Sequence, residues 1–586
     1  MMGSGFRAIA LCAIGSVLGA LLAGPAHASP TSAVTVDPID EGQGATFSPG
    51  VRLVSELPQA YTEEEFVVSG AATLYNYAND PPQGPMDIVP IVEDVPYATR
   101  VIVRRPLSHE DFNGTVVIEW WNSTAGFDSA PVWDTSAEYF ARKGIVYVGV
   151  TNSTTAIDFL VGGCRLFGVL PPRCGARYAM LSLPENGLAN EMMSQIAHRL
   201  KSSLLDEPLP GGFEVERVYH AGQSQQGGSV ITYASAFDFP GNDGYFVQNA
   251  ASARTINSGP ACGAPGSFSF PFCTPRLQGA DARVRTDLSV PVVHAVTEMD
   301  IEVLFGTVGR QPDTPTFRYY EVAGGSHLTV HKDVEILPAG LLGPDPLLLE
   351  DLCQFPLNST ADGPVFFSYV LNALWDNLER QVRAGRHGRH GRHGRHGRHG
   401  RHGRHEADDH DEDDSDSDSH GRRVRWRWLP PAGEIMATGP SGEIERDAFG
   451  NGRGGVRLPA LTVPTATYTP GNSADPSLPP FLQGIGNLAC RLGGSVQPFD
   501  VTTLDELYPN HKRYVRKVAR SARKLRRQRL LLREDAARIV SDALVSNVAC
   551  GVGYELVFVL PPILWLRRRL APAAGRKAPG CRDTPS

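Results

Sequence analysis

A serine, an aspartate and a histidine occur in this chain in an order that nucleophilic acyl-transfer chemistry can use. The serine, Ser224, lies in the glycine-bounded segment 222–227. A serine hydroxyl is a weak nucleophile at neutral pH, so it needs a neighbouring base and donors that stabilise the oxyanion formed on attack. We expect His327 to be that base and Asp300 to be the carboxylate that orients it, with Glu298 as the alternative acid.

Each of these side chains lies just beyond a segment with the composition of a buried strand. The predicted strands are residues 115–120, 145–150, 215–220, 245–249, 291–296 and 317–322. Helical periodicity over 132–142 and 187–201 separates several of them. The alternation predicts an α/β fold with a mostly parallel central sheet and helices on both faces. Active sites in such sheets lie at the carboxyl ends of the strands, where all three candidates occur.

Backbone N–H groups are the expected donors to the oxyanion. A tight turn from strand into helix would expose the Ser224 hydroxyl and aim the N–H of Gln225 at the substrate oxygen. A second donor should come from the loop that follows the predicted strand 115–120. We nominate the backbone of Trp121 or Asn122 for that role.

These segments resemble the α/β-hydrolase superfamily and, more closely, the family named "alpha/beta hydrolase domain", many of whose members are bacterial. The matching segments are residues 114–120, 222–225, 291–300, 321–327 and 450–459. The resemblance covers roughly residues 51–548, apart from one insertion, and implies a single elaborated catalytic domain that hydrolyses esters or related acyl bonds. The chain departs from the usual G-x-S-x-G pattern at Gln226, and a glycine follows at Gly227.

The first 28 residues have the features of a secretory signal peptide. Arg7 precedes an apolar stretch that runs to about residue 23, and Ala26-His27-Ala28 offers a small-x-small cleavage site. We therefore expect an exported protein, secreted or periplasmic, with residues 29–550 forming one α/β-hydrolase domain.

Export to an oxidising compartment would allow the cysteines to pair. Two close pairs lie in Gly/Pro-rich stretches and are predicted to form local bridges, which are Cys164–Cys174 and Cys262–Cys273. The loops that they close could form cap insertions over the site. By elimination, the remaining pairs are Cys353–Cys490 and Cys550–Cys581.

Residues 384–423 interrupt the alternating pattern. Seven Gly-Arg-His triplets fill residues 385–405, and an acidic tract covers 406–418. This composition has almost no apolar surface to bury, so it predicts a disordered insertion. The histidines could sequester metal, but a surface loop is the favoured interpretation because their spacing in such a chain fixes no ligand geometry.

Two further segments carry positive charge. Residues 512–529 read as a basic surface helix with one narrow apolar stripe, and the basic face is expected to be solvated. The tail 551–586 is apolar and then basic, too short in its apolar part to span a bilayer, and could touch a membrane surface weakly.

The whole chain has a net charge of −8 and a pI near 6.1, which does not favour a nucleic-acid partner. The sequence predicts a serine hydrolase of a small-molecule or lipid-like ester that needs no metal or organic cofactor. The alternative is a non-catalytic binding protein built on a hydrolase scaffold.

Overall fold

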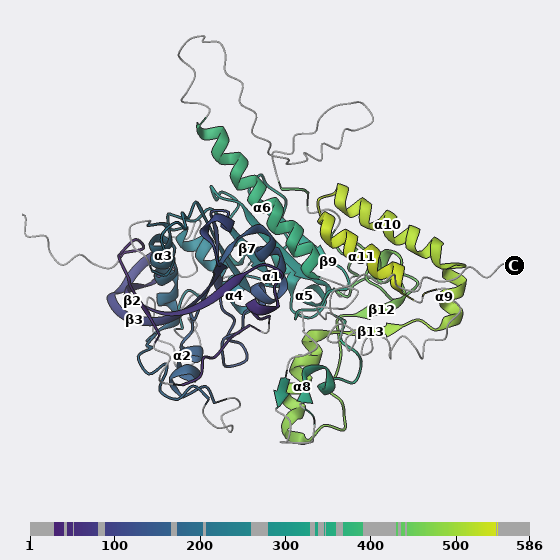
Figure 1. Cartoon of the computed structure of the whole chain (residues 1–586), viewed down its shortest axis with the longest axis horizontal. Helices are drawn as coiled ribbons and strands as arrows, with labels where there is room; N and C mark the ends of the chain where they lie inside the picture. The colour runs from purple at the N-terminus through teal and green to yellow at the C-terminus, as the bar shows by residue number, and fades with distance from the viewer. Residues whose placement is uncertain are drawn as a thin grey trace, which may run out of the picture.

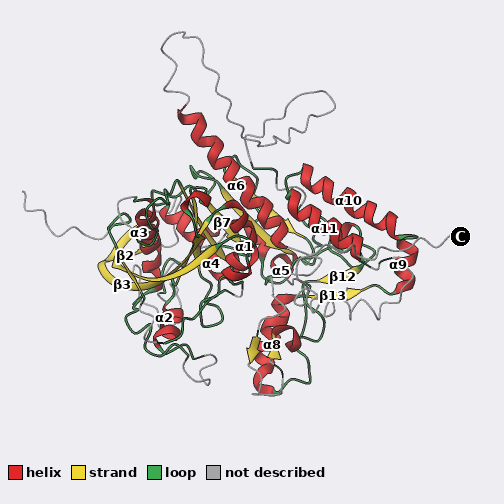
Figure 2. Ribbon diagram, in the orientation of Figure 1, coloured by secondary structure: helices red, strands yellow, loops and turns green. Residues whose placement is uncertain are grey.

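The computed structural model describes residues 29–39, 44–50, 52–79, 88–165, 173–202, 207–258, 279–328, 335–337, 345, 347–358, 367–390, 429–431, 435–439, 442–546 and 548. An α/β body surrounds a large sheet, helix α6 crosses that body diagonally, and a further helical region lies beyond it (Figures 1 and 2). The predicted signal peptide, the bridges Cys262–Cys273 and Cys550–Cys581, and the tail 551–586 lie outside the described residues.

The central sheet has nine strands in the order β1-β2-β3-β5-β4-β6-β7-β8-β9. Their bounds are β1 (Thr35–Pro38), β2 (Tyr61–Tyr77), β3 (Ile88–Pro106), β4 (Thr115–Trp120), β5 (Val146–Val150), β6 (Arg217–Gln223), β7 (Gly244–Gln248), β8 (Val292–Thr297) and β9 (Phe317–Val322). Pairing is antiparallel from β1 through β3 to β5 and parallel among β5, β4, β6, β7, β8 and β9. The chain passes from β4 to β5 on one side and returns to β6 on the other. This reversal creates a switch point at the carboxyl end of β6, where open α/β sheets bind ligands.

Helices cover both faces of this sheet because its parallel strands are apolar on both sides, and every residue of β4 is buried. The helices that belong to the body are α1 (Pro131–Lys143), α2 (Thr154–Val161), α3 (Ala189–Lys201), α4 (Gln225–Thr232), α5 (Glu298–Glu302) and α6 (Phe367–His390). Met192 of α3 and Val230 of α4 belong to the core on one face. Trp133 of α1 and Trp375 of α6 belong to the core on the other, where Trp375 stacks on Phe246 of β7 at a ring-centroid distance of 4.0 Å.

The chain after residue 429 adds a second group of elements beside β9. They are α7 (Pro459–Thr462), β12 (Ala466–Thr469), α8 (Pro480–Gly493), β13 (Ser495–Pro498), α9 (Val501–Leu507), α10 (His511–Arg527) and α11 (Arg533–Val545). Two short strands, β10 (Glu335–Leu337) and β11 (Leu347–Leu348), pair with each other before α6. The group joins the body through a parallel bridge between Val322 and Val456 and through Leu429, which packs in one cluster with Trp375.

The predicted fold class is confirmed, and the predicted strands correspond to β4 through β9 within a few residues. The basic helix is also confirmed as α10, whose stripe of Tyr514, Val518, Ala522 and Leu525 is buried. Disulfides Cys164–Cys174 and Cys353–Cys490 are formed as predicted.

Two features differ from expectation. The long hairpin of β2 and β3 was not anticipated, because its outer half mixes exposed and half-buried residues. Helix α6 continues to His390, so the first residues of the insertion are helical rather than disordered. Once a helix is nucleated by packing, as α6 is around Trp375, each further residue adds a hydrogen bond at little cost. The rest of the insertion, 391–423, lies outside the described residues.

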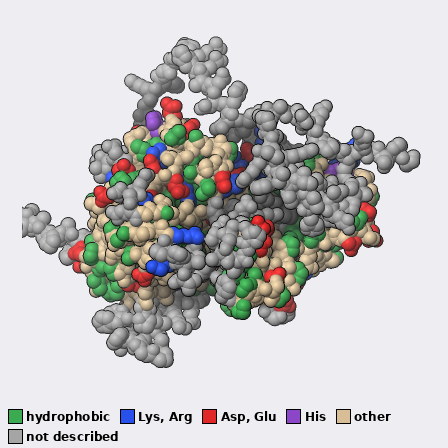
Figure 3. Space-filling model, turned by 60° about the horizontal axis from the view of Figure 1, so that its bottom comes forward, with side chains coloured by type: hydrophobic (Ala, Val, Ile, Leu, Met, Phe, Trp, Pro, Cys, Tyr) green, Lys and Arg blue, Asp and Glu red, His purple; other side chains and the backbone are tan. Residues whose placement is uncertain are grey.

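On the face of the α/β body in Figure 3, acidic, basic and apolar side chains are interspersed. No helix in the described ranges combines the length and the apolar character that crossing a bilayer requires.

Candidate active site

Ser224 occupies the turn between β6 and α4 with the backbone angles φ 55° and ψ −117°, which non-glycine residues rarely adopt. Glycines permit this turn at two points. A side chain at Gly222 would collide with the carbonyl of Gln226, and a Cβ at Gly227 would lie 2.8 Å from the Cβ of Ala250. The same Cβ would lie 2.9 Å from the carbonyl oxygen of Gln248 in β7, so the close approach to β7 falls at Gly227, which explains how the turn tolerates a glutamine at position 226.

Three of the predicted side chains form one hydrogen-bonded chain. Nε2 of His327 lies 2.8 Å from Oγ of Ser224, and Nδ1 lies 2.6 Å from Oδ1 of Asp300. Asp300 is 1% exposed and His327 is 5% exposed, so water screens these contacts little.

The local sequence explains how Asp300 is held. Thr297 caps the N-terminus of α5, and Asp300 stands three residues later, which is the spacing of a capping box. Oδ2 of Asp300 accepts hydrogen bonds from both N and Oγ1 of Thr297 at 2.7 Å. One carboxylate oxygen therefore fixes the side chain, and the other faces the imidazole.

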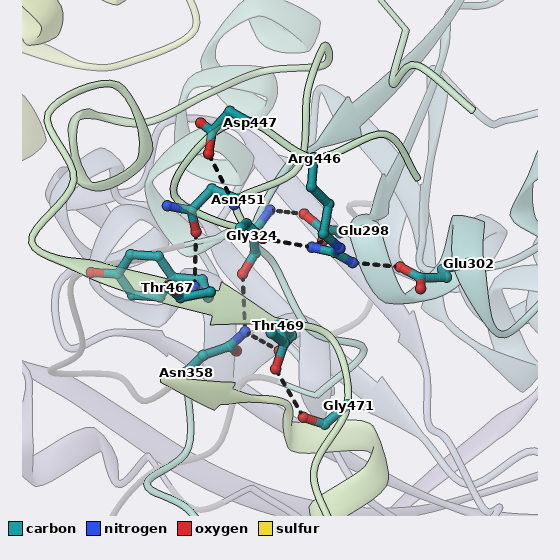
Figure 4. Close-up of polar contacts among 12 residues, drawn as sticks. Glu298, Glu302, Gly324, Asn358, Arg446, Asp447, Asn451, Thr467, Thr469 and Gly471 are labelled. Atoms are coloured by element: carbon teal, nitrogen blue, oxygen red, sulfur yellow. Dashed lines mark hydrogen bonds and ion pairs between the residues drawn. The ribbon is translucent and has the colours of Figure 1, made fainter. Parts of the chain in front are cut away.

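Glu298, the alternative acid, has different partners. Its Oε2 accepts a hydrogen bond from N of Gly324 at 2.6 Å, and its Oε1 pairs with Arg446 at 2.7 Å (Figure 4). Arg446 also pairs with Glu302 at 2.7 Å. Burial raises the pKa of Glu298, and the guanidinium of Arg446 opposes that rise. Glu298 thus contacts the backbone of the loop that carries His327, residues 323–328, which we call the histidine loop. It does not contact the imidazole.

The backbone groups nominated as second oxyanion donor are already bonded. N of Trp121 donates to O of Val150 at 3.2 Å, and N of Asn122 donates to O of Ser129 at 3.1 Å. Backbone hydrogen bonding thus continues for two residues past the end of β4. The sequence does not show this, because it does not show where pairing between neighbouring segments stops. Neither N–H is therefore available to a substrate oxygen in this structure. This corrects the prediction that the backbone of Trp121 or Asn122 supplies the second oxyanion donor.

Gln225 is the first residue of α4, where helix geometry leaves backbone N–H groups without intrahelical partners. Its side-chain Oε1 lies 3.4 Å from Oγ of Ser123 and 3.3 Å from Oγ1 of Thr124. Oγ of Ser153, at the start of α2, lies 2.7 Å from Oγ of Ser123. These contacts place the loop after β4 directly beside the serine turn.

Three buried amide side chains near the site were missed by sequence reasoning. Gln223 and Asn249 both donate from their amide nitrogens to the carbonyl oxygen of His327, at 3.0 and 2.7 Å. Asn122 in turn donates to Oε1 of Gln223 at 3.1 Å. Their position at the carboxyl ends of β6, β7 and β4 is the signal that could have identified them.

The family model described as alpha/beta hydrolase domain matches residues 35–541. The chain belongs to this family, and it is a hydrolase by class. Among solved structures, one described as a dienelactone hydrolase from Klebsiella pneumoniae is similar at 12% identity and a TM-score of 0.23. That alignment covers 44% of this chain and 85% of the other, and a likeness of this size says nothing about the reaction. No curated protein matches the chain.

Proposed function

We propose that this protein is an exported serine hydrolase that cleaves a carboxylic ester, or a related acyl bond, through an acyl-enzyme at Ser224. The observation that carries the proposal is the pair of hydrogen bonds at His327, 2.8 Å to Ser224 and 2.6 Å to Asp300. A base within hydrogen-bond reach of the nucleophile, itself oriented by a buried carboxylate, is the arrangement that acyl transfer requires.

The reaction follows from this geometry. Nε2 of His327 takes the proton from Oγ of Ser224 as the oxygen attacks the ester carbonyl. Asp300 orients the ring and stabilises its positive charge. The imidazolium then protonates the leaving alcohol, and the acyl group remains on the serine. Water, deprotonated by the same imidazole, attacks the acyl-enzyme and releases the acid.

For the oxyanion, we assign the N–H of Gln225 as one donor and the N–H of Ser123 as the second. Ser123 is 5% exposed, and its hydroxyl contacts the side chain of Gln225. Its backbone follows Asn122, whose own N–H is already used within the loop. Two N–H groups converging on one oxygen would stabilise the charge that develops on attack.

An apolar acyl or aryl group fits the surroundings of this loop. Phe127 lies a few residues after Ser123 and forms a half-buried trio with Phe47 and Phe159. The ring centroids are 5.0 to 5.9 Å apart. Such half-exposed aromatic surface is suited to an apolar ligand group. The tryptophans Trp120, Trp121 and Trp133, by contrast, are fully packed in the core.

Export is part of the proposal. It rests on the signal-like residues 1–28 and on the disulfides Cys164–Cys174 and Cys353–Cys490, which are compatible with an oxidising compartment.

Labelling with a fluorophosphonate probe tests the proposal, because such a probe reacts with an activated serine. Wild-type protein should be labelled and should hydrolyse short aryl esters, whereas Ser224→Ala and His327→Ala should do neither at a comparable rate. Folded wild-type protein that resists labelling would favour the alternative of a binding protein on a hydrolase scaffold.

A further inference from the structure

The loop that carries His327 is supported from behind by two segments distant in sequence. Its Gly324 accepts a hydrogen bond, through the carbonyl oxygen, from Nδ2 of Asn358 at 3.1 Å (Figure 4). Its Leu328 donates from N to the carbonyl oxygen of Leu492 at 3.0 Å. Supports therefore act just before and just after the histidine.

Asn358 is fully buried and its side chain is well satisfied. Besides Gly324, its Nδ2 donates to O of Thr469 in β12 at 2.9 Å, and its Oδ1 accepts from Oγ of Ser326. Two of the three partners belong to the histidine loop, and one of them, Ser326, immediately precedes His327. A change in the position of Asn358 would therefore shift the segment 324–326 that leads into His327.

A disulfide joins the two supporting segments. Cys353 lies in the segment 352–358 that ends at Asn358, and Cys490 lies in α8 together with Leu492. Backbone hydrogen bonds also pair segment 352–358 with residues 473–475 and with β13. The disulfide thus links segment 352–358 to α8. We call these two linked segments, which support the histidine loop, the frame.

Within this frame, the end of α8 fits tightly. Gly494 has a φ of 63°, and a Cβ there would collide with Oγ of Ser326 and lie 2.8 Å from Nδ2 of Asn358. Only a glycine is accommodated at this point, so small shifts of α8 reach both side chains. Cys490 is fully buried, and Cys353 is half-buried.

We propose that Asn358, held in place by the Cys353–Cys490 disulfide, is a positioning residue for His327, and that turnover depends on this disulfide being oxidised. The proposal rests on the hydrolase function proposed above. A displacement of about 1 Å between a base and its nucleophile can lower the rate on the order of 100-fold, so loosening the frame should act on kcat. The groups proposed to hold the substrate, Gln225 and Ser123, make no hydrogen bond to Asn358 among the described residues, so KM should change little.

The test compares two disulfides of the intact chain. The double variant Cys353→Ser/Cys490→Ser should lose about 10- to 100-fold in kcat towards an aryl ester, with KM within about twofold of wild type. The matched control is Cys164→Ser/Cys174→Ser, which opens a disulfide that follows α2 and has no contact with the histidine loop among the described residues. N of Cys164 donates to O of Phe159 in the proposed acyl surroundings, so any effect of this variant should fall on KM, while kcat stays within about threefold of wild type.

Dithiothreitol supplies a reversible version of the same change. It transfers two electrons and two protons to the Cys353–Cys490 bond, giving two thiols and its own cyclic disulfide. Wild-type turnover should fall and should return on reoxidation, whereas the Cys353→Ser/Cys490→Ser variant should not respond further. If that variant fails to fold, Asn358→Ala with the disulfide intact carries the test, and it should show the same loss of kcat at constant KM.

A folded Cys353→Ser/Cys490→Ser variant with wild-type kcat would overturn the inference while leaving the serine mechanism untouched. A rise in KM at constant kcat would overturn it as well. Oxidised wild-type protein that neither labels with fluorophosphonate nor turns over ester would overturn both proposals together.

Discussion

Replacing Asp300 by asparagine tests the assignment of the orienting acid most directly. Thr297 presents two donors to Oδ2 of Asp300, so an asparagine must turn its amide oxygen towards Thr297 and its NH₂ towards the imidazole. Nδ1 of His327 would then have to accept a hydrogen bond. The ring would carry its proton on Nε2, 2.8 Å from Oγ of Ser224, where a proton acceptor is needed.

The expected loss is large because the wrong tautomer removes the base. Loss of the orienting carboxylate from a Ser-His-Asp triad by this substitution lowers kcat about 10⁴-fold, and we expect Asp300→Asn to do the same here. That factor corresponds to about 5 kcal/mol in the activation free energy. The assay is steady-state hydrolysis of an aryl ester, with the rate of fluorophosphonate labelling as a second measure of serine reactivity.

Glu298→Gln is the matched control, since it neutralises the other candidate acid. The amide oxygen can still accept from N of Gly324, while the ion pair with Arg446 is lost, so kcat should fall less than about tenfold. A loss for Glu298→Gln as large as that for Asp300→Asn would refute the assignment of Asp300 as the sole orienting carboxylate.

Three further outcomes can be measured. Because Ser224 has a positive φ, Ser224→Gly should be more stable than Ser224→Ala by about 1 kcal/mol in urea unfolding, although neither hydrolyses ester. Burial raises the pKa of Glu119 to about 8 from its ordinary 4.5, so the folded state binds an extra proton between these values. The free energy of unfolding should therefore fall as pH rises through that window, and Glu119→Gln should flatten this slope. On α10, Arg516 stands one helical turn from both Lys512 and Arg520, so Arg516→Glu should stabilise the protein by about 1 kcal/mol at low salt and by less at high salt.

The parallel half of the fold could be predicted because its strands are short, apolar and separated by helical periodicity. The antiparallel hairpin could not, since β3 (Ile88–Pro106) begins with exposed residues and becomes buried only in its second half. A strand is recognised by the alternation of apolar and polar residues, which arises where one face is buried. Half of β3 is not buried, so that half lacks the pattern.

The sequence predicted those residues of the candidate site that can be recognised from their immediate neighbours in the chain. Ser224, Asp300 and His327 each follow a strand, and the spacing from Thr297 to Asp300 marks a capping box that could have separated Asp300 from Glu298. Asn358 could not be found in this way, because its contacts with Gly324 and Thr469 depend on how distant segments fold together. Likewise, the hydrogen bond of Trp121 with Val150 depends on where strand pairing ends in space.

Because the chain is synthesised from its N-terminus, the frame behind His327 is made later than the site that it supports. A ribosome completes Ser224, Asp300 and His327 well before it reaches Leu492, and a long insertion lies between them. Under the proposed mechanism, a nascent or truncated chain would contain every reacting group but lack the support proposed to align them. Full turnover would be reached only with the final third of the polypeptide and with the closing of a covalent bond, so the chain would be a weak catalyst while it is being made.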